Sequence, residues 1–182
     1  MMRVLVAAVA LTLASPAAAK PWKHPSAGFA LDIPAGWDER VESRTATGAV
    51  FLPSPSFLAN IACTVVAAPL GGPPATPAGW RMPDEVLANP TALLTRNGDR
   101  VSAILGKQKF GGLNGFPGWQ LWADVVSPGG VAPYFKLITH VLSGPNAQIT
   151  AVCITPANVR GSLNDKTIQE SLALGVSLRA AP

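Results

Sequence analysis

Hydrophobic and polar positions alternate over several short stretches of the chain, and each such stretch predicts a β-strand. Residues Phe29–Ile33 alternate apolar with small or polar side chains, and Thr47–Leu52 is a second candidate strand, ended by Pro53. Runs rich in β-branched residues surround Cys63 and Cys153 and are typical of strands. Residues Arg100–Phe110 predict a further strand. The chain is therefore expected to be rich in β-structure.

Two of the predicted strands suit a hairpin. The odd-numbered positions are mostly apolar in both Trp119–Val125 and Tyr134–Val141, and the turn sequence Ser127–Gly130 lies between them. Because a one-residue slip turns one apolar face to solvent, the pattern predicts that odd positions pair with odd positions. In that register the opposite face of the hairpin is shared by Trp122, Asp124, Tyr134, Lys136 and His140.

Helical patterns are fewer. Between residues 81 and 96 the prolines Pro83 and Pro90 permit two short helical pieces, since proline is tolerated at a first helical position. Residues Leu163–Leu174 carry apolar side chains at helical spacing, and we expect Gly175 to end this helix. The order of strands, short helices, antiparallel strands and a terminal helix predicts an α+β fold with the helices packed on the sheet.

The first nineteen residues have the pattern of a secretion signal. Arg3 is followed by the uncharged stretch Val4–Leu13, and small residues lead up to Ala19. A membrane-spanning helix needs about 20 apolar residues, whereas this run breaks at Ser15 and Pro16. We therefore expect a signal peptide over residues 1–19, cleaved after Ala19 or a neighbouring residue, and a single domain over residues 20–182 without a transmembrane segment. The mature protein is expected to be periplasmic or secreted.

Export changes the interpretation of the cysteines. The chain has two, Cys63 and Cys153, and an oxidising compartment leaves them one intramolecular pairing. We expect a disulfide bond between them. Two buried free thiols, or a redox or metal pair, are the alternatives, although redox pairs are usually close in sequence and metal sites need more ligands.

Composition excludes one class of partner. The chain has 14 Lys and Arg residues against 10 Asp and Glu residues, for a net charge of +4, and the basic residues are scattered. A nucleic-acid-binding surface needs clustered positive charge, so we expect no nucleic-acid partner. Only 13% of the residues are charged, while 17 glycines and 18 prolines favour many turns and extended segments.

The segment Gly28–Trp37 resembles the opening motif of the PsbP-like (Mog/PsbP-type) domains, in which an aromatic strand ends in Pro-x-Gly-Trp. The end of the chain is similar to theirs as well: the strand with Cys153 is followed by a helix and by the sequence Val176–Arg179. The resemblance implies an exported bacterial member with an α/β/α sandwich, in which a few short helices and a C-terminal helix flank a central antiparallel sheet. Known members are mostly accessory or binding proteins, and the fold does not determine the function.

Motifs of common enzymes are absent from the sequence. It has no Gly-x-Ser-x-Gly elbow, no phosphate-binding loop and no His-Glu-x-x-His motif. We assign no catalytic residues and expect no metal and no cofactor. Of the two histidines, His24 is expected to be mobile near the new N-terminus.

His140 is the one candidate general base. On the predicted hairpin face Asp124 could orient it, and Trp122 and Tyr134 could form the walls of a pocket, as in a small periplasmic hydrolase. The alternative is a strand residue that is hydrogen-bonded locally, with Asp124 paired across the hairpin to Lys136. No nucleophile is identified on that face.

Exposed aromatic residues suggest a partner contact instead. Trp80 lies next to Arg81 at the end of a loop rich in proline and glycine, and Trp122 is a further candidate, while Trp37 and Trp119 are expected in the core. The sequence therefore favours a non-enzymatic binding or accessory protein whose partner is an unknown protein or envelope component. The hydrolase built on His140 and Asp124 is the alternative.

Overall fold

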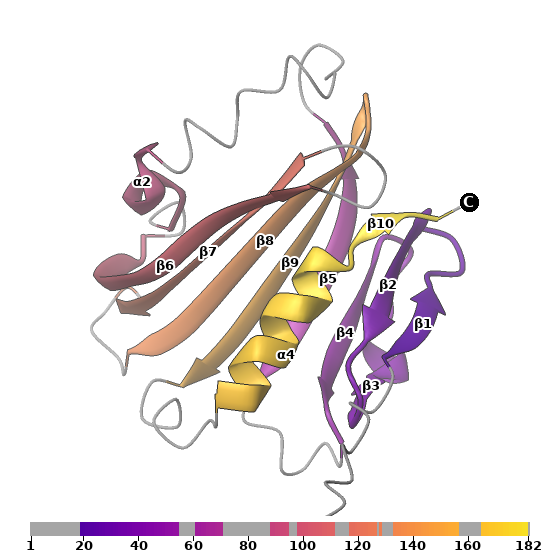
Figure 1. Cartoon of the computed structure of the whole chain (residues 1–182), viewed down its shortest axis with the longest axis horizontal. Coiled ribbons are helices and arrows are strands. Elements are labelled where there is room, and N and C mark those ends of the chain that lie inside the picture. The colour runs from indigo at the N-terminus through magenta and orange to yellow at the C-terminus, as the bar shows by residue number, and fades with distance from the viewer. Residues whose placement is uncertain are drawn as a thin grey trace, which may run out of the picture.

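Antiparallel sheets dominate the computed structural model, which describes residues 19–54, 61–70, 88–94, 98–111, 117–126, 128, 133–156 and 165–181 (Figure 1). A three-stranded sheet has the order β1-β2-β10, and a seven-stranded sheet has the order β3-β4-β5-β9-β8-β7-β6. The strands are β1 (Lys20–Lys23), β2 (Phe29–Ile33), β3 (Trp37–Glu39), β4 (Gly48–Pro53), β5 (Ala62–Pro69), β6 (Arg100–Gly111), β7 (Pro117–Val126), β8 (Tyr134–Gly144), β9 (Ala147–Pro156) and β10 (Arg179–Ala180). All of their pairings are antiparallel.

Within the described ranges the strands are accompanied by the helical segments η1 (Val41–Ser43), α2 (Pro90–Leu94) and α4 (Asp165–Val176). In Figure 1, α4 lies across one face of the seven-stranded sheet, and the small sheet lies on the same side. We call this side the inner face and the opposite side the outer face. Among the helices in the described ranges, none combines the length and the apolar content that a membrane span requires.

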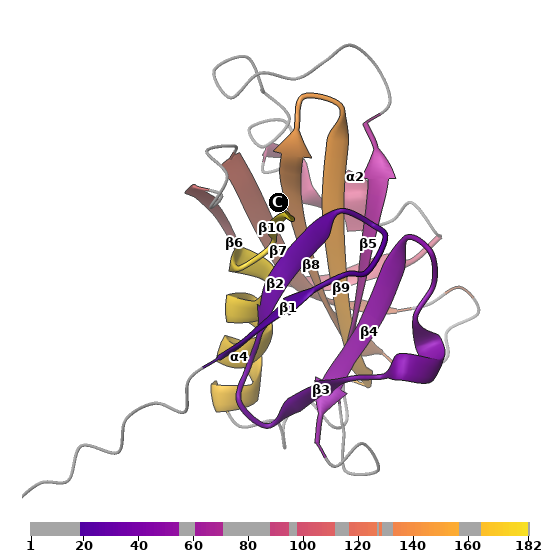
Figure 2. The same cartoon turned by 90° about the vertical axis from the view of Figure 1, so that its right-hand side faces the viewer.

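The main core lies between the inner face and the layer formed by α4 and the small sheet, which Figure 2 shows from the side. Alternate residues of β2 point into it, as the sequence pattern predicted. Its buried members are Phe29, Leu31, Ile33, Trp37, Ala49, Phe51, Ile61, Cys63, Val65, Phe135, Leu137, Val141, Ile149, Ala151, Cys153, Leu174 and Leu178. A second cluster on the outer face consists of Leu94, Trp119, Leu121, Ala123, Val125 and Ile138. The seven-stranded sheet is therefore apolar on both faces.

The predicted disulfide is confirmed. Cys63 of β5 and Cys153 of β9 are direct partners in the strand register and are joined by a disulfide bond that closes a separation of 90 residues. Both side chains are buried in the main core.

The predicted register of the hairpin is wrong. Odd positions of β7 pair with even positions of β8, as in Trp119 with His140 and Asp124 with Phe135. The prediction assumed that one face of the hairpin is in solvent, but β8 is buried on both faces. Register is specified by alternation only where one face is exposed, so the apolar residues of β7 and β8 can lie on opposite faces.

Gly175 does not end the last helix. Helix α4 continues to Val176, and Gly175 is not among the glycines with a positive φ angle. A Cβ atom at this position would lie 2.2 Å from Thr139 Oγ1 and 2.6 Å from Gln120 Nε2. The close approach of the helix to the sheet therefore explains why this position is a glycine.

The predicted sheet-rich antiparallel fold is confirmed, whereas the sequence pattern gave no indication of β1 and β3. The second helical piece is present as α2, and the first lies outside the described residues. The sandwich with helices on both faces therefore stays a prediction.

His24 was expected to be mobile near the new N-terminus. It is 1% exposed and hydrogen-bonded, so that expectation is wrong.

Candidate functional site

A pocket in the described part of the chain lies between α4 and the end of β2. It has a volume of about 550 Å³, within the range typical of ligand-binding pockets. Its lining residues are Ala19, Asp32, Pro34, Ala35, Lys166, Gln169, Glu170, Ala173 and Ser177. We call it the α4–β2 pocket. Residues of α4 that are three or four positions apart lie on one side of the helix, which is why they line it together.

Small apolar side chains make up much of the pocket. Pro34 and Ala35 begin the turn that leads from β2 to β3, and Ala173 lies opposite them on α4. The proline fixes the backbone at the start of the turn, and Gly36 supplies a positive φ of 78°. The Pro-x-Gly-Trp motif therefore shapes one wall of the pocket.

Polar groups at the rim tie its two walls together. The indole of Trp37 donates a hydrogen bond to Glu170 Oε2 at 3.0 Å, which links the turn after β2 to α4. Asp32 Oδ1 accepts from Arg179 at 2.7 Å, and the backbone N–H of Asp32 donates to Ser177 Oγ at 2.9 Å. The walls are therefore held in place before any ligand binds.

Lys166 is the most accessible charged group of the pocket. Its side chain is 76% exposed, and its ammonium lies 3.7 Å from Glu170 Oε1, four residues along the helix. An exposed pair of this kind stabilises a helix by only a few tenths of a kcal/mol. Lys166 can therefore turn toward a ligand at little cost. The arrangement can hold an apolar group against the alanines while its polar end meets the rim.

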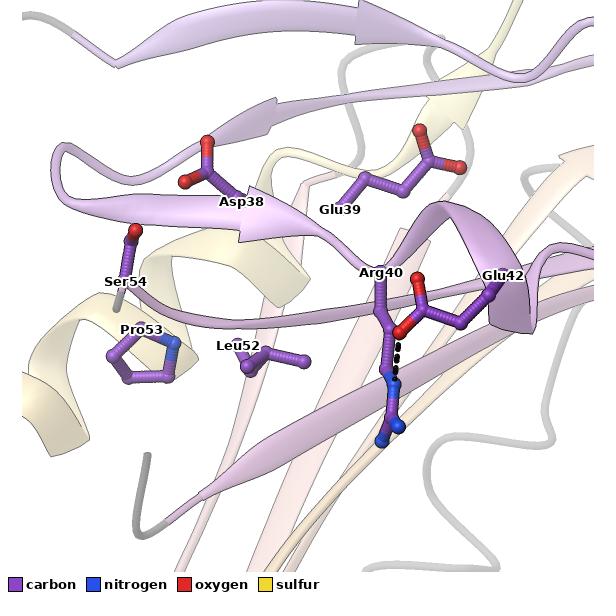
Figure 3. Close-up of a pocket in the computed structure, with 7 residues that line it drawn as sticks. All are labelled: Asp38, Glu39, Arg40, Glu42, Leu52, Pro53 and Ser54. Atoms are coloured by element: carbon purple, nitrogen blue, oxygen red, sulfur yellow. Dashed lines mark hydrogen bonds and ion pairs between the residues drawn. The ribbon is translucent and has the colours of Figure 1, made fainter. Parts of the chain in front are cut away.

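A second pocket, of about 170 Å³, lies where β3 and β4 meet η1, and Figure 3 shows its lining residues. Arg40 and Glu42 form an ion pair of 2.8 Å there. The carboxylate of Glu39 accepts hydrogen bonds from Arg44 and from the indole of Trp22, and these bonds, chiefly that from Arg44, lower its pKa. The pocket is small, and its charges are largely paired within the fold.

His140 is held in the sheet by local contacts. Its ring stacks on that of Trp119, with centroids 5.4 Å apart and planes at 15°, and its Nδ1 lies 3.0 Å from Thr150 Oγ1. The residue is 7% exposed. These contacts match the expectation of a strand residue that is bonded locally.

The structure does not bring the candidate hydrolase residues together. Asp124 pairs with Phe135 and lies on the inner face, while His140 lies on the outer face. Tyr134 is on the outer face with His140 but six residues away along β8. The predicted site depended on the incorrect register, and Asp124 cannot orient the imidazole of His140 across the sheet.

Tyr134 and Lys136 belong to a different cluster. Asp99 accepts hydrogen bonds from the phenol of Tyr134 at 2.6 Å and from the ammonium of Lys136 at 3.1 Å. Both bonds lower the pKa of Asp99, and that from Tyr134 is the stronger cause. Burial, followed by the bond to Asp99, raises the pKa of Tyr134 to about 12. This cluster ties the start of β6 to β8 and keeps the phenol neutral.

The predicted partner contacts are only partly described. Trp80 and Arg81 lie outside the described residues. Trp122 is half-buried on the inner face, and its ring lies directly over Gly106. A Cβ atom on Gly106 would be only 2.2 Å from Trp122 Cζ2. Trp122 therefore packs within the fold.

The sequence did not predict the α4–β2 pocket, although the Pro-x-Gly-Trp motif is part of its wall.

Comparison with known proteins identifies the fold. No family model and no curated protein sequence matches the chain. The solution structure of cyanobacterial PsbP (CyanoP) from Synechocystis sp. PCC 6803 is similar, with 14% identity and a TM-score of 0.56 over 97% of this chain and 98% of that one. The fold is PsbP-like.

Two further solved structures support this conclusion. LpqN, described as involved in cell envelope biogenesis of Mycobacterium tuberculosis, has 18% identity and a TM-score of 0.52 over 89% of this chain and 90% of that one. A protein from Bacteroides thetaiotaomicron VPI-5482 has 13% identity and a TM-score of 0.53 over 91% of this chain and 50% of that one. At these identities the similarity establishes the PsbP-like fold, and function has to be argued from the site.

Proposed function

We propose that the protein is an exported accessory protein of the cell envelope that binds a protein or other envelope component at the α4–β2 pocket. The observation that carries the proposal is the pocket itself: about 550 Å³, with a wall of small apolar side chains and a few charged groups at the rim. A pocket with these properties is the usual form of a binding site. Its walls are already fixed by the bonds from Trp37 to Glu170 and from Arg179 to Asp32.

Export is supported by two independent features. Residues 1–19 have the pattern of a signal peptide, and the Cys63–Cys153 disulfide is typical of proteins outside the reducing cytoplasm. The description of LpqN as involved in cell envelope biogenesis fits the same location. We infer that the mature chain begins at Lys20 or close to it.

A binding role suits the site better than hydrolysis does. General-base catalysis needs a base within hydrogen-bond reach of its orienting group, and Asp124 and His140 lie on opposite faces of the sheet. None of the described residues that line the α4–β2 pocket is a histidine or a cysteine. The geometry therefore supports recognition at this pocket, and the hydrolase is not proposed.

The proposal is tested by capture from envelope extract with the mature protein and two variants. Ala173→Trp fills the pocket, while the matched change Ala68→Trp adds an indole at an exposed position on β5, away from the pocket. We expect a component that is retained by the wild type and by A68W and lost with A173W. Equal retention by all three proteins would contradict the proposal.

Export is tested separately by mass spectrometry of the protein purified from cells. An intact Met1 would show that the signal peptide is not removed.

A further inference from the structure

His24 makes hydrogen bonds through both ring nitrogens. Its Nδ1 accepts from the backbone N–H of Ala27 at 2.8 Å and from that of Ser26 at 3.1 Å. Its Nε2 lies 3.1 Å from the carbonyl oxygen of Thr45 and 3.2 Å from that of Gly48. The residue is 1% exposed, so water does not compete for these bonds.

These partners fix the protonation of the ring. A backbone N–H can only donate, so Nδ1 carries no proton, and a carbonyl can only accept, so Nε2 carries one. The imidazole is therefore neutral, with its proton on Nε2. An additional proton on Nδ1 would face two N–H donors and would break both bonds to the turn.

Two of the four bonds hold the local turn, and the other two reach residues 21 and 24 positions further along the chain. The turn from Ser26 to Gly28, where Gly28 has a φ of 68°, leads from β1 to β2. Gly48 is the first residue of β4, and Thr45 lies three residues before it. The ring also lies 5.7 Å from that of Trp22 and 5.1 Å from that of Phe29. His24 thus holds the β1–β2 hairpin against the seven-stranded sheet.

Charged groups around the ring offer a protonated imidazole little compensation. Lys23 precedes it in β1. From β3, the carboxylate of Glu39 acts on the ring at longer range. That carboxylate is bonded to Arg44, which follows η1, and to the indole of Trp22. The charge of the Glu39 carboxylate is therefore largely neutralised by its own partners.

We propose that His24 is an acid-sensitive lock: protonation of Nδ1 releases the β1–β2 turn and loosens β1 from the rest of the fold. Imidazole is the side chain that ordinarily gains a proton between pH 5 and pH 8. β1 pairs directly with β2, and Asp32 of β2, the register partner of Pro21, lines the α4–β2 pocket, so loosening β1 also removes support from that wall. This last consequence rests on the proposed function, whereas the lock itself does not.

The protonation state can be observed directly in the folded wild-type protein. Long-range proton–nitrogen NMR correlations of the mature protein at pH 7.5 are expected to show one histidine as the neutral Nε2–H form, assigned to His24 by its loss in His24→Gln. A proton on Nδ1 of His24 at this pH would overturn the proposal.

Release is measured by hydrogen exchange between pH 7.5 and pH 5, corrected for the intrinsic rate of exchange. We expect protection of residues 20–31 and 44–48 to fall about tenfold or more on acidification, while β8 and β9 stay protected. His24→Gln should abolish this pH dependence, and His140→Gln, which alters the chain's other histidine, should retain it. The proposal fails if wild-type protection is unchanged by acid, or if H140Q rather than H24Q removes the effect. Should H24Q not fold, the wild-type and H140Q results decide.

Discussion

His140 stacks on Trp119, its direct partner across the β7–β8 pair, with ring centroids 5.4 Å apart. The pairing places His140 on the outer face of the sheet and Asp124 on the inner face, which separates the two residues that a hydrolase would need together. His140 is instead part of the packing of the outer face, where Thr150 accepts or donates the bond at its Nδ1. Its replacement should therefore affect stability and leave recognition intact.

We expect His140→Ala to lower the free energy of unfolding by about 2–4 kcal/mol, as other large-to-small changes in a core do. The physical reason is the loss of the ring from a position that is 7% exposed. Urea-induced unfolding measures the change, and His140→Phe, which keeps a ring on Trp119, should recover part of it. Unchanged stability together with loss of a catalytic activity would contradict this account.

Removal of the disulfide should be costly as well. The Cys63–Cys153 bond closes 90 residues, and loss of a native disulfide typically lowers the free energy of unfolding by about 2–5 kcal/mol. We expect this range for the double variant Cys63→Ala, Cys153→Ala in denaturant unfolding. Because both sulfurs are buried, they should resist alkylation in the folded protein until reductant and denaturant are both present. Two thiols that react without reductant would show that the bond is absent.

The disulfide and the register differ in how well the sequence could predict them. With two cysteines and an export signal, Cys63 and Cys153 had one possible intramolecular partner each. The register of β7 and β8 had no comparable constraint, because both faces of β8 are buried and a shift of one residue leaves its apolar side chains covered either way. Alternation of apolar residues therefore predicts where strands lie. It does not predict which residues of two strands are paired when both faces of the sheet are covered.

Gly175 provides a test of the contact between α4 and the sheet. Alanine is favoured over glycine in a helix by about 1 kcal/mol, so a helix in open space would gain stability. Here the new Cβ would lie 2.2 Å from Thr139 Oγ1, and we expect Gly175→Ala to lose about 1–3 kcal/mol through overpacking. Gly144→Ala, with nothing within 4 Å of its Cβ, is the matched control and should be nearly neutral. A stabilised G175A variant would show that α4 does not approach the sheet so closely.

Tyr134 predicts a dependence of stability on alkaline pH. Its pKa is raised to about 12, chiefly by burial and then by Asp99. A folded-state pKa above the unfolded value of about 10 means that this contribution to stability is complete below pH 10 and is lost as the pH rises through about 12.

Tyrosinate absorbance measures this titration without overlap, because the chain has one tyrosine. Asp99→Asn should lower the pKa of Tyr134 and leave the part due to burial. Titration of the folded wild type near pH 10 would contradict the geometry of the cluster. Tyr134→Phe should remove the alkaline dependence and cost about 1–2 kcal/mol at neutral pH.

The candidate site was beyond sequence reasoning for a related reason. Asp32 and Pro34 lie more than 130 residues from Lys166 and Ala173, and none of these residues belongs to a recognised binding motif. Pocket walls of alanine and proline carry no chemical signature, so only the packing of α4 beside β2 reveals them. The bonds of His24 were hidden in the same way: its partners Ser26 and Ala27 are local, but Thr45 and Gly48 are brought to it by β4.

The central claim, that a partner is recognised at the α4–β2 pocket, is tested most directly by photo-crosslinking in the cell envelope. A photoreactive residue at Gln169, exposed at the rim of the pocket, is compared with one at Arg100, exposed at the start of β6. We predict a specific adduct at Gln169 that is absent at Arg100 and is lost when Ala173→Trp fills the pocket. No adduct at Gln169, or one that persists unchanged with A173W, would contradict the claim.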